Sequence, residues 1–156
     1  MPSKLKTKVK SSEQSGQSPT AAAYLSLERL INIEASSEGE LADYVERRLP
    51  TRSLSRLLKN GLQESSLYDL VIPRRTLEHR VEKKELLTTD ESDKAVRIAR
   101  VIGLAEYVFK SKVMAWAWLE DLGQFNGKSP LLKAATAAGA RQVEERLYQI
   151  YYGIFG

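Results

Sequence analysis

Few stretches of the sequence combine residue types that serve enzyme chemistry. Gly127-Lys128-Ser129 resembles the end of a phosphate-binding loop, but that motif needs four residues between its glycines, and only three separate Gly123 from Gly127. The single histidine, His79, lies among arginines with no nucleophile to partner it, and the sequence contains no cysteine. Most carboxylates have Lys or Arg neighbours at helical spacing. We therefore predict no catalytic residues, no metal site and no cofactor.

A different chemistry is indicated between residues 74 and 84, where five Lys or Arg residues stand against two glutamates. Basic side chains in a row on one helix are suited to contacting phosphates and base edges in a DNA groove, although many such rows are only solvated helix faces. Leu77 and Val81 are expected to turn inward and leave the polar residues outside. The candidate DNA-binding residues are Arg74, Arg75, Thr76, His79 and Arg80.

Helical elements must position this row, because apolar residues recur every three to four positions from Ala21 to Phe155 and strand patterns are almost absent. The fold class is therefore predicted to be all-α. QESSLYDL, the turn Val71-Ile72-Pro73 and RRTLEHRVEKK have the pattern of a helix-turn-helix. Leu67 and Val71 stand where such motifs usually place a small residue and a glycine, so we expect a non-standard turn.

Capping residues predict where the other helices begin and end. Helices are expected over AAAYLSLERLINI, ELADYVERRL and SLSRLLK, then from about Glu91 to Phe109, through MAWAWLED to Gly123, and over AAGARQVEERLYQIYYG. The expected N-caps are Thr20, Thr51, Thr88 with Glu91 in a capping box, Ser111, Ser129 before Pro130, and Thr136. In the last helix, Val143, Leu147, Ile150 and Ile154 form one apolar stripe.

Composition divides the chain into three regions. Residues 1–20 carry four lysines against one glutamate without apolar periodicity, and are expected to be a disordered basic tail. Residues 21–87 form the helix-turn-helix region, and residues 88–156 form a small second helical region. No apolar run approaches the ~20 residues that cross a bilayer and no signal segment is present, so we expect a cytoplasmic protein that does not engage a membrane.

A long ordered series of residues resembles a known family. PRRTLEHRVEKKELLTTDESDKAVRIARV, followed by WLEDLGQFNGKSPLLKAATAAGARQVEERLYQIYYGIF, is similar to the bacterial Xre/MbcA/ParS-type antitoxins, above all to the Xre partners of RES-domain toxins. The match runs from about Thr51 to Gly156. Lys94 stands where the family often has Arg, His79 interrupts an often all-basic helix, and residues 1–50 match poorly.

The resemblance implies a non-enzymatic bacterial antitoxin with two parts. One part would form a homodimer or higher toxin–antitoxin assembly and bind operator DNA to repress its own operon. The other would bind and occlude a RES-type toxin that consumes NAD. The alternative is a helix-turn-helix repressor with a helical dimerisation domain and no toxin partner.

Aromatic residues suggest where a toxin would bind, because aromatic side chains dominate protein interfaces. The final stretch IYYGIFG is apolar, and the competing interpretation is that it folds back onto the protein's own core. Trp116 and Trp118 point in opposite directions on a helix, so Trp118 is expected inside and Trp116 toward a partner. The candidate toxin-binding residues are Trp116, Tyr148, Tyr151, Tyr152, Ile154, Phe155 and Gly156.

Overall fold

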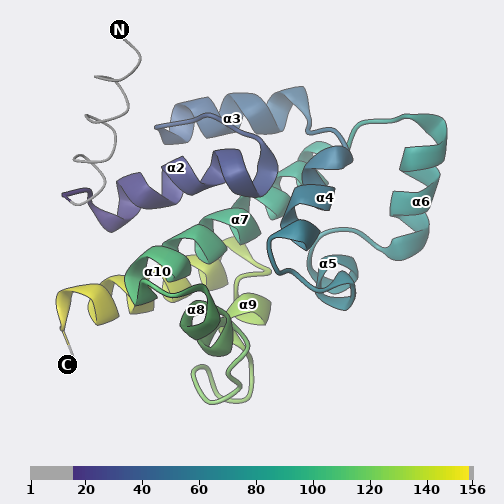
Figure 1. Cartoon of the computed structure of the whole chain (residues 1–156). Helices are drawn as coiled ribbons and strands as arrows, with labels where there is room; N and C mark the ends of the chain where they lie inside the picture. Colours follow the sequence, from purple (N-terminus) through teal and green to yellow (C-terminus); the bar gives the residue numbers. More distant parts are fainter. Residues whose placement is uncertain (1–15, 155–156) are drawn as a thin grey trace, which may run out of the picture.

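The structure, a computed structural model, describes residues 16–154 and is built from α-helices (Figure 1). Within that range the chain forms no strand, only two isolated bridges, so the all-α prediction is confirmed. Residues 1–15 of the predicted basic tail lie outside the described residues, and its last two residues, Pro19 and Thr20, belong to α2 instead. The helices are α2 (Pro19–Ile31), α3 (Glu38–Arg47), α4 (Arg52–Lys59), α5 (Glu64–Leu70), α6 (Arg74–Lys83), α7 (Thr89–Phe109), α8 (Lys112–Leu119), α9 (Pro130–Lys133) and α10 (Ala137–Tyr152).

The long helix α7 is the centre of the molecule, and α2, α3, α8 and α10 all pack on it (Figure 1). It starts with the predicted capping box: the Thr88 hydroxyl accepts from the Glu91 amide, and the Glu91 carboxylate accepts from the Thr88 amide. Its inward residues Val96, Ala99 and Ile102 are buried, as predicted. Gly103 of α7 allows α2 to approach closely. A Cβ at this position would lie only 2.6 Å from the Cβ of Ser26 on α2.

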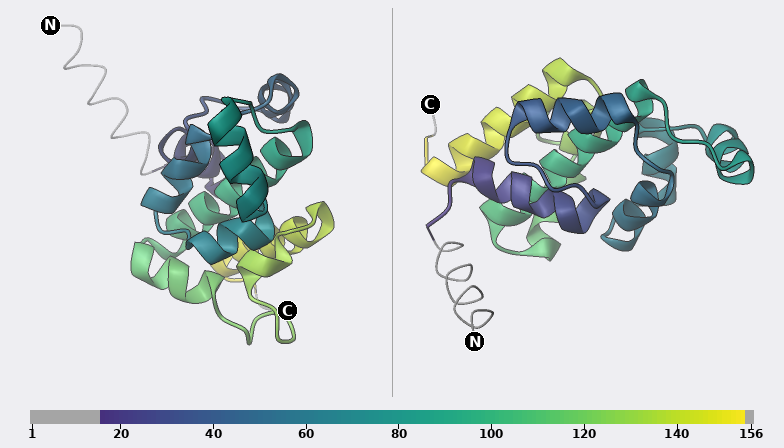
Figure 2. Two further views of the ribbon diagram at one scale, coloured as in Figure 1. Left: turned by 90° about the vertical axis from the view of Figure 1, so that its right-hand side faces the viewer. Right: turned by 90° about the horizontal axis from the view of Figure 1, so that it is seen from above.

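The helix-turn-helix consists of α5, the turn at residues 71–73 and α6. Leu67, Leu70, Val71 and Ile72 are buried, which fixes α5 and the turn to the body. In contrast, α6 contains no buried residue and stands away from the body in Figures 1 and 2. Leu77 is half-buried against the core, but Val81 is exposed, so the prediction that Val81 faces inward was wrong. Val81 lies one turn farther along a helix that extends beyond the elements able to cover it.

One cluster of buried side chains runs from Ala23 on α2 to Leu147 on α10. The predicted division between residues 87 and 88 crosses this shared core: the Leu87 amide donates to the Leu49 carbonyl at 2.8 Å, and Leu49 donates to the hydroxyl of Ser92 at 2.9 Å. The division stays a prediction. Helix α7 packs against α2 and α3 from the first predicted region and against α8 and α10 from the second.

Several helix boundaries differ slightly from the predictions. Ser18 caps α2 instead of Thr20, and Thr51 makes no side-chain capping bond. The predicted caps at Ser111, Ser129 and Thr136 are confirmed. Helix α8 ends at Leu119 rather than continuing to Gly123.

The apolar stripe of α10 is interrupted near its end. Val143 and Leu147 are buried and Ile150 is half-buried, but the helix ends at Tyr152. Gly153 then adopts a left-handed conformation with φ of 67°. This turn takes Ile154 off the stripe and leaves it exposed.

The start of α2 and the end of α10 lie side by side in Figures 1 and 2. Helix α6 lies at the other end of the molecule, near the start of α7. Among residues 16–154, no helix is long and apolar enough to cross a bilayer.

Candidate binding surfaces at the two ends of the molecule

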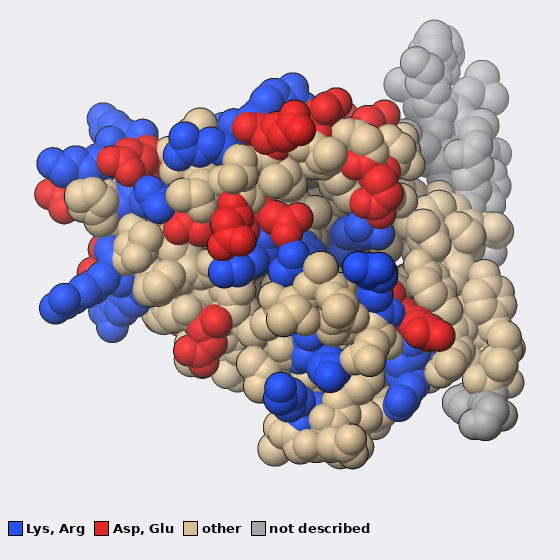
Figure 3. Space-filling view, turned by 180° about the vertical axis from the view of Figure 1, so that it is seen from behind, with Lys and Arg blue, Asp and Glu red and all other residues tan. Residues whose placement is uncertain are grey.

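The helix α6 presents the basic surface. Arg75 and His79 are exposed, Thr76 is half-buried, and Arg74 is exposed while pairing with Glu78 one turn later at 3.1 Å. Lys83 and Lys84 extend the charge past the last turn. In Figure 3, Lys and Arg side chains gather at the end of the molecule where α6 stands. We call this surface the basic end and define it by Arg74, Arg75, His79, Lys83 and Lys84.

Arg80 is the one candidate DNA-binding residue whose side chain turns to the protein itself. Its guanidinium donates to both oxygens of Glu91, at 2.8 and 3.2 Å, and to Glu85 at 3.2 Å. The side chains of Arg80 and Glu91 are only 16% and 11% exposed. This bidentate pair ties the protruding α6 to the first turn of α7.

The pKa values of the two partners report the same contact. Hydrogen bonding to Glu91 raises the pKa of Arg80 above its usual value. Burial acts to raise the pKa of Glu91, but hydrogen bonds from the Thr88 amide and from Arg80 outweigh it, so this pKa lies below its usual range. Both groups are therefore held in their charged forms.

The aromatic end lies where α2 begins and α10 ends, and we define it by Tyr107, Tyr151, Tyr152 and Ile154. The rings of Tyr107 and Tyr151 lie 5.6 Å apart, and Tyr152 packs edge-on against Tyr151 at 4.9 Å. Tyr151, Tyr152 and Ile154 are exposed. Figure 3 shows this side of the molecule, next to the grey residues, as largely free of charged atoms.

Tyr148 takes part in this end differently. It is half-buried against the core, and its hydroxyl lies 2.8 Å from the hydroxyl of Thr20 on α2. The candidate residues Phe155 and Gly156 lie outside the described residues. Tyr107 and Leu25, an exposed residue of α2, were missed by the sequence reasoning because they belong to helices distant in sequence.

The two tryptophans of α8 separate as their spacing predicts. Trp118 is buried and packs against Phe109 with ring centroids 5.7 Å apart. Trp116 is half-buried, and its ring fits over Gly61, where a Cβ would lie 2.9 Å from the indole. The indole nitrogen of Trp116 is buried and has no hydrogen-bond partner. Its predicted role in toxin binding stays a prediction, and in the structure it packs on the turn after α4.

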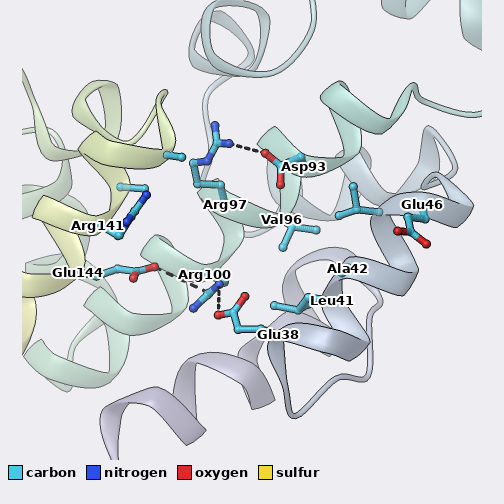
Figure 4. A pocket seen from close by; sticks show the side chains of 13 residues that line it. Glu38, Leu41, Ala42, Glu46, Asp93, Val96, Arg97, Arg100, Arg141 and Glu144 are labelled. Carbon is cyan, nitrogen blue, oxygen red and sulfur yellow. Dashed lines mark hydrogen bonds and ion pairs between the residues drawn. The ribbon is translucent and has the colours of Figure 1, made fainter.

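A groove of about 720 Å³ separates α3 from α10 above α7 (Figure 4). Arg100 of α7 is its central side chain: it pairs with Glu38 at 2.8 Å, approaches Glu144 at 3.8 Å, and lies over the ring of Tyr24. Arg97 pairs with Asp93 beside it. Burial raises the pKa of Glu144, and Arg100 offsets part of that effect. The groove is thus lined by paired charges from three helices, α3, α7 and α10.

No group of three or more metal-ligating side chains occurs among residues 16–154. The class of the protein follows from the fold and the basic end: an all-helical body that carries a helix-turn-helix with an exposed, basic second helix.

The comparisons with known proteins identify the family. The model of the antitoxin Xre-like helix-turn-helix domain matches residues 40–100, which span most of α3, all of α4, α5 and α6, and the first half of α7. Antitoxin Xre of Pseudomonas putida is 35% identical over 129 residues, which cover 81% of this chain and 81% of that protein. The chain belongs to the Xre antitoxin family, and the resemblance noted in the sequence is confirmed.

Proposed function

We propose that this protein is the antitoxin of a type II toxin–antitoxin pair. In this proposal it binds and occludes a RES-type toxin that consumes NAD, and it binds operator DNA to repress its own operon. It acts by binding, without catalysis, and in the bacterial cytoplasm where its operon lies. The observation that carries the proposal is the placement of a basic helix-turn-helix and an uncharged aromatic surface at opposite ends of one rigid helix, α7.

The basic end supports the DNA-binding half of the proposal. Arg75 and His79 are exposed on a helix that stands clear of the body. Arg74 pairs with Glu78, and both of these side chains are exposed to solvent. Such exposed pairs are weak, so a phosphate can replace Glu78 at small cost. We assign DNA contacts to Arg74, Arg75, Thr76 and His79, and give Arg80 the task of holding α6 in place through Glu91. A homodimer would present two such helices to a palindromic operator.

The aromatic end supports the toxin-binding half. Aromatic side chains offer large contact area at small entropic cost, which is why they concentrate at the centres of interfaces. Tyr151, Tyr152 and Ile154 are exposed, and Tyr148, one turn earlier in α10, hydrogen-bonds to Thr20 of α2. We assign toxin contacts to these residues and to Phe155 and Gly156, which continue the same segment.

The proposal is tested by mixing the full chain with the RES-domain protein encoded in the same operon. We expect wild type to bind the toxin and stop its consumption of NAD. Tyr152→Ala should weaken binding about 10- to 100-fold, because one truncated interface aromatic typically costs about 1–3 kcal/mol. Val81→Ala, also an exposed apolar residue but on α6, is the matched control and should bind as wild type does.

The competing interpretation predicts a different result. If the wild-type chain binds operator DNA but neither binds the RES-domain protein nor protects NAD, the protein is a repressor without a toxin. If toxin binds and Tyr152→Ala has no effect, the antitoxin function stands and the aromatic end is not its interface.

A further inference from the structure

The first helix described, α2, is joined to the aromatic end by polar contacts. The Thr20 hydroxyl meets the hydroxyl of Tyr148 on α10 at 2.8 Å, and the Tyr107 hydroxyl donates to the carbonyl of Gln17 just before α2. In sequence, α2 precedes the helix-turn-helix and lies outside the part matched by the family's domain model. In space, its first turns lie beside the last turn of α10 (Figures 1 and 2).

A cavity of about 380 Å³ opens between α2 and Tyr107. Leu25 lies at its rim and is 57% exposed, although it is a large apolar residue in a well-formed helix. Tyr107 also packs against Tyr151, so this residue belongs both to the cavity lining and to the aromatic end. The residues that line the cavity are Gln17, Ala22, Leu25, Ser26, Arg29 and Tyr107.

Among the residues that the structure describes, the cavity offers no unpaired charge to a ligand. Its one charged residue, Arg29, already donates to Glu106 at 2.6 Å and to the side-chain oxygen of Asn60 at 2.7 Å. The exposed Leu25 beside an arginine that is already paired suits an uncharged side chain, because a charged one would lose hydration without gaining a partner. This surface also lies at the end opposite to α6, which argues against DNA as its occupant.

The described part of the aromatic end is smaller than a typical protein interface. Tyr151, Tyr152 and Ile154 are 36%, 58% and 63% exposed. At about 200 Å² for a fully exposed aromatic side chain, the three present on the order of 300 Å². A stable interface uses about 800 Å² on each partner. Leu25, the exposed large apolar residue of the neighbouring α2, can add to this area.

We propose that α2 forms the second half of the toxin-binding surface, with Leu25 and the cavity beside it receiving an apolar side chain of the toxin. This inference rests on the proposed function and deepens it. The toxin-binding site then combines residues from before and after the helix-turn-helix, and it does not follow the boundary predicted between residues 87 and 88.

The test compares three single variants of the full chain for affinity to the RES-domain toxin, measured by titration calorimetry, and for operator binding. Leu25→Lys places a charge at the cavity rim and should weaken toxin binding at least 10-fold. Leu25→Met keeps an apolar chain of similar volume and should bind nearly as wild type does. Val113→Lys, at an exposed apolar position on α8, is the matched control and should not change toxin affinity. All three should bind operator DNA normally.

The outcomes separate this inference from the function on which it rests. If Tyr152→Ala weakens toxin binding but Leu25→Lys does not, the role of α2 is overturned while the antitoxin function stands. If Leu25→Lys and Val113→Lys weaken binding equally, a general charge effect replaces a specific cavity, and the inference also fails. If wild type does not bind the toxin, the proposed function itself fails. In that case loss of self-association in Leu25→Lys would assign the surface to a second copy of this chain and overturn the inference.

Discussion

Glu91 performs two tasks with one carboxylate. It accepts the amide of Thr88, which closes the first turn of α7, and it accepts the guanidinium of Arg80, which holds α6. Both contacts are shielded from water, since the side chain is 11% exposed. A buried charge that loses its partners is costly, so the two contacts stabilise the carboxylate jointly.

We predict that Glu91→Gln lowers the free energy of unfolding by about 1–3 kcal/mol at pH 7. The folded-state pKa of Glu91 is lowered, so its contribution is fully present above the unfolded pKa of about 4.3 and is lost as pH falls through the folded pKa. Urea titrations at pH 7 and at pH 3 measure this. The difference from wild type should shrink at pH 3.

The matched control is Glu78→Gln. Glu78 also pairs with an arginine on α6, but both side chains are exposed, and its removal should change stability by less than about 0.5 kcal/mol. An equal loss for Glu91→Gln at both pH values would show that packing, not charge, stabilises this corner.

Single residues were predictable where their partners are local in sequence. The capping box at Thr88 and Glu91, the burial of Trp118 and the cap at Thr136 all follow from spacings of two to four residues. The Arg80–Glu91 pair was not predictable in the same way. It depends on how α6 and α7 are oriented, which no local pattern specifies.

At the scale of elements, the close contact between α2 and α7 depends on a glycine, Gly103, which has no side chain. Gly103 lies in the middle of α7, where glycine costs helix stability relative to alanine. A Cβ there would lie 2.6 Å from the Cβ and 2.9 Å from the hydroxyl of Ser26. Both atoms are close to the α2 backbone, so α2 itself would have to move.

We predict that Gly103→Ala destabilises the protein by about 1–3 kcal/mol, because the overpacking exceeds the gain in helix propensity. Combining it with Ser26→Gly, which removes both clashing atoms, should recover part of that loss. A double-mutant cycle by thermal or urea denaturation measures the coupling, expected at about 0.5–3 kcal/mol. Additive effects of the two changes would mean that α2 is not held at this point.

The helices themselves were largely predictable, and their environment was less so. Ser, Thr and Pro residues mark most helix starts, and the boundaries differ from the structure by only a few residues. Periodicity also identifies the apolar face of α6, but it does not say whether another element covers that face. Val81 is therefore apolar, on the expected face, and exposed.

At the scale of the whole molecule, the order of the helices was predictable but the meeting of α2 with α10 was not. That meeting depends on the length of α7 and on the packing of helices that are distant in sequence. The Thr20–Tyr148 contact spans 128 residues. The division of the chain into a DNA-binding and a toxin-binding region was read along the sequence, whereas the proposed toxin surface is assembled across it.

The length of α7 also predicts that the two ends act independently. Glu91 marks the basic end of the helix and Tyr107 the aromatic end, and sixteen residues at 1.5 Å each separate them by about 24 Å. The Debye length at physiological salt is about 8 Å, so a charge removed from α6 is screened before it reaches the aromatic end.

We therefore predict that Arg75→Ala weakens operator binding by about 1–3 kcal/mol and leaves toxin affinity unchanged. If Arg75 contacts a phosphate, the slope of log affinity against log salt concentration should decrease in magnitude by about 0.9, because one fewer counterion is released. The matched control is Arg141→Ala, an exposed arginine on α10, which should keep the full slope. An unchanged slope together with relaxed sequence preference would assign Arg75 to a base rather than a phosphate. A loss of toxin affinity in Arg75→Ala would contradict the separation of the two ends.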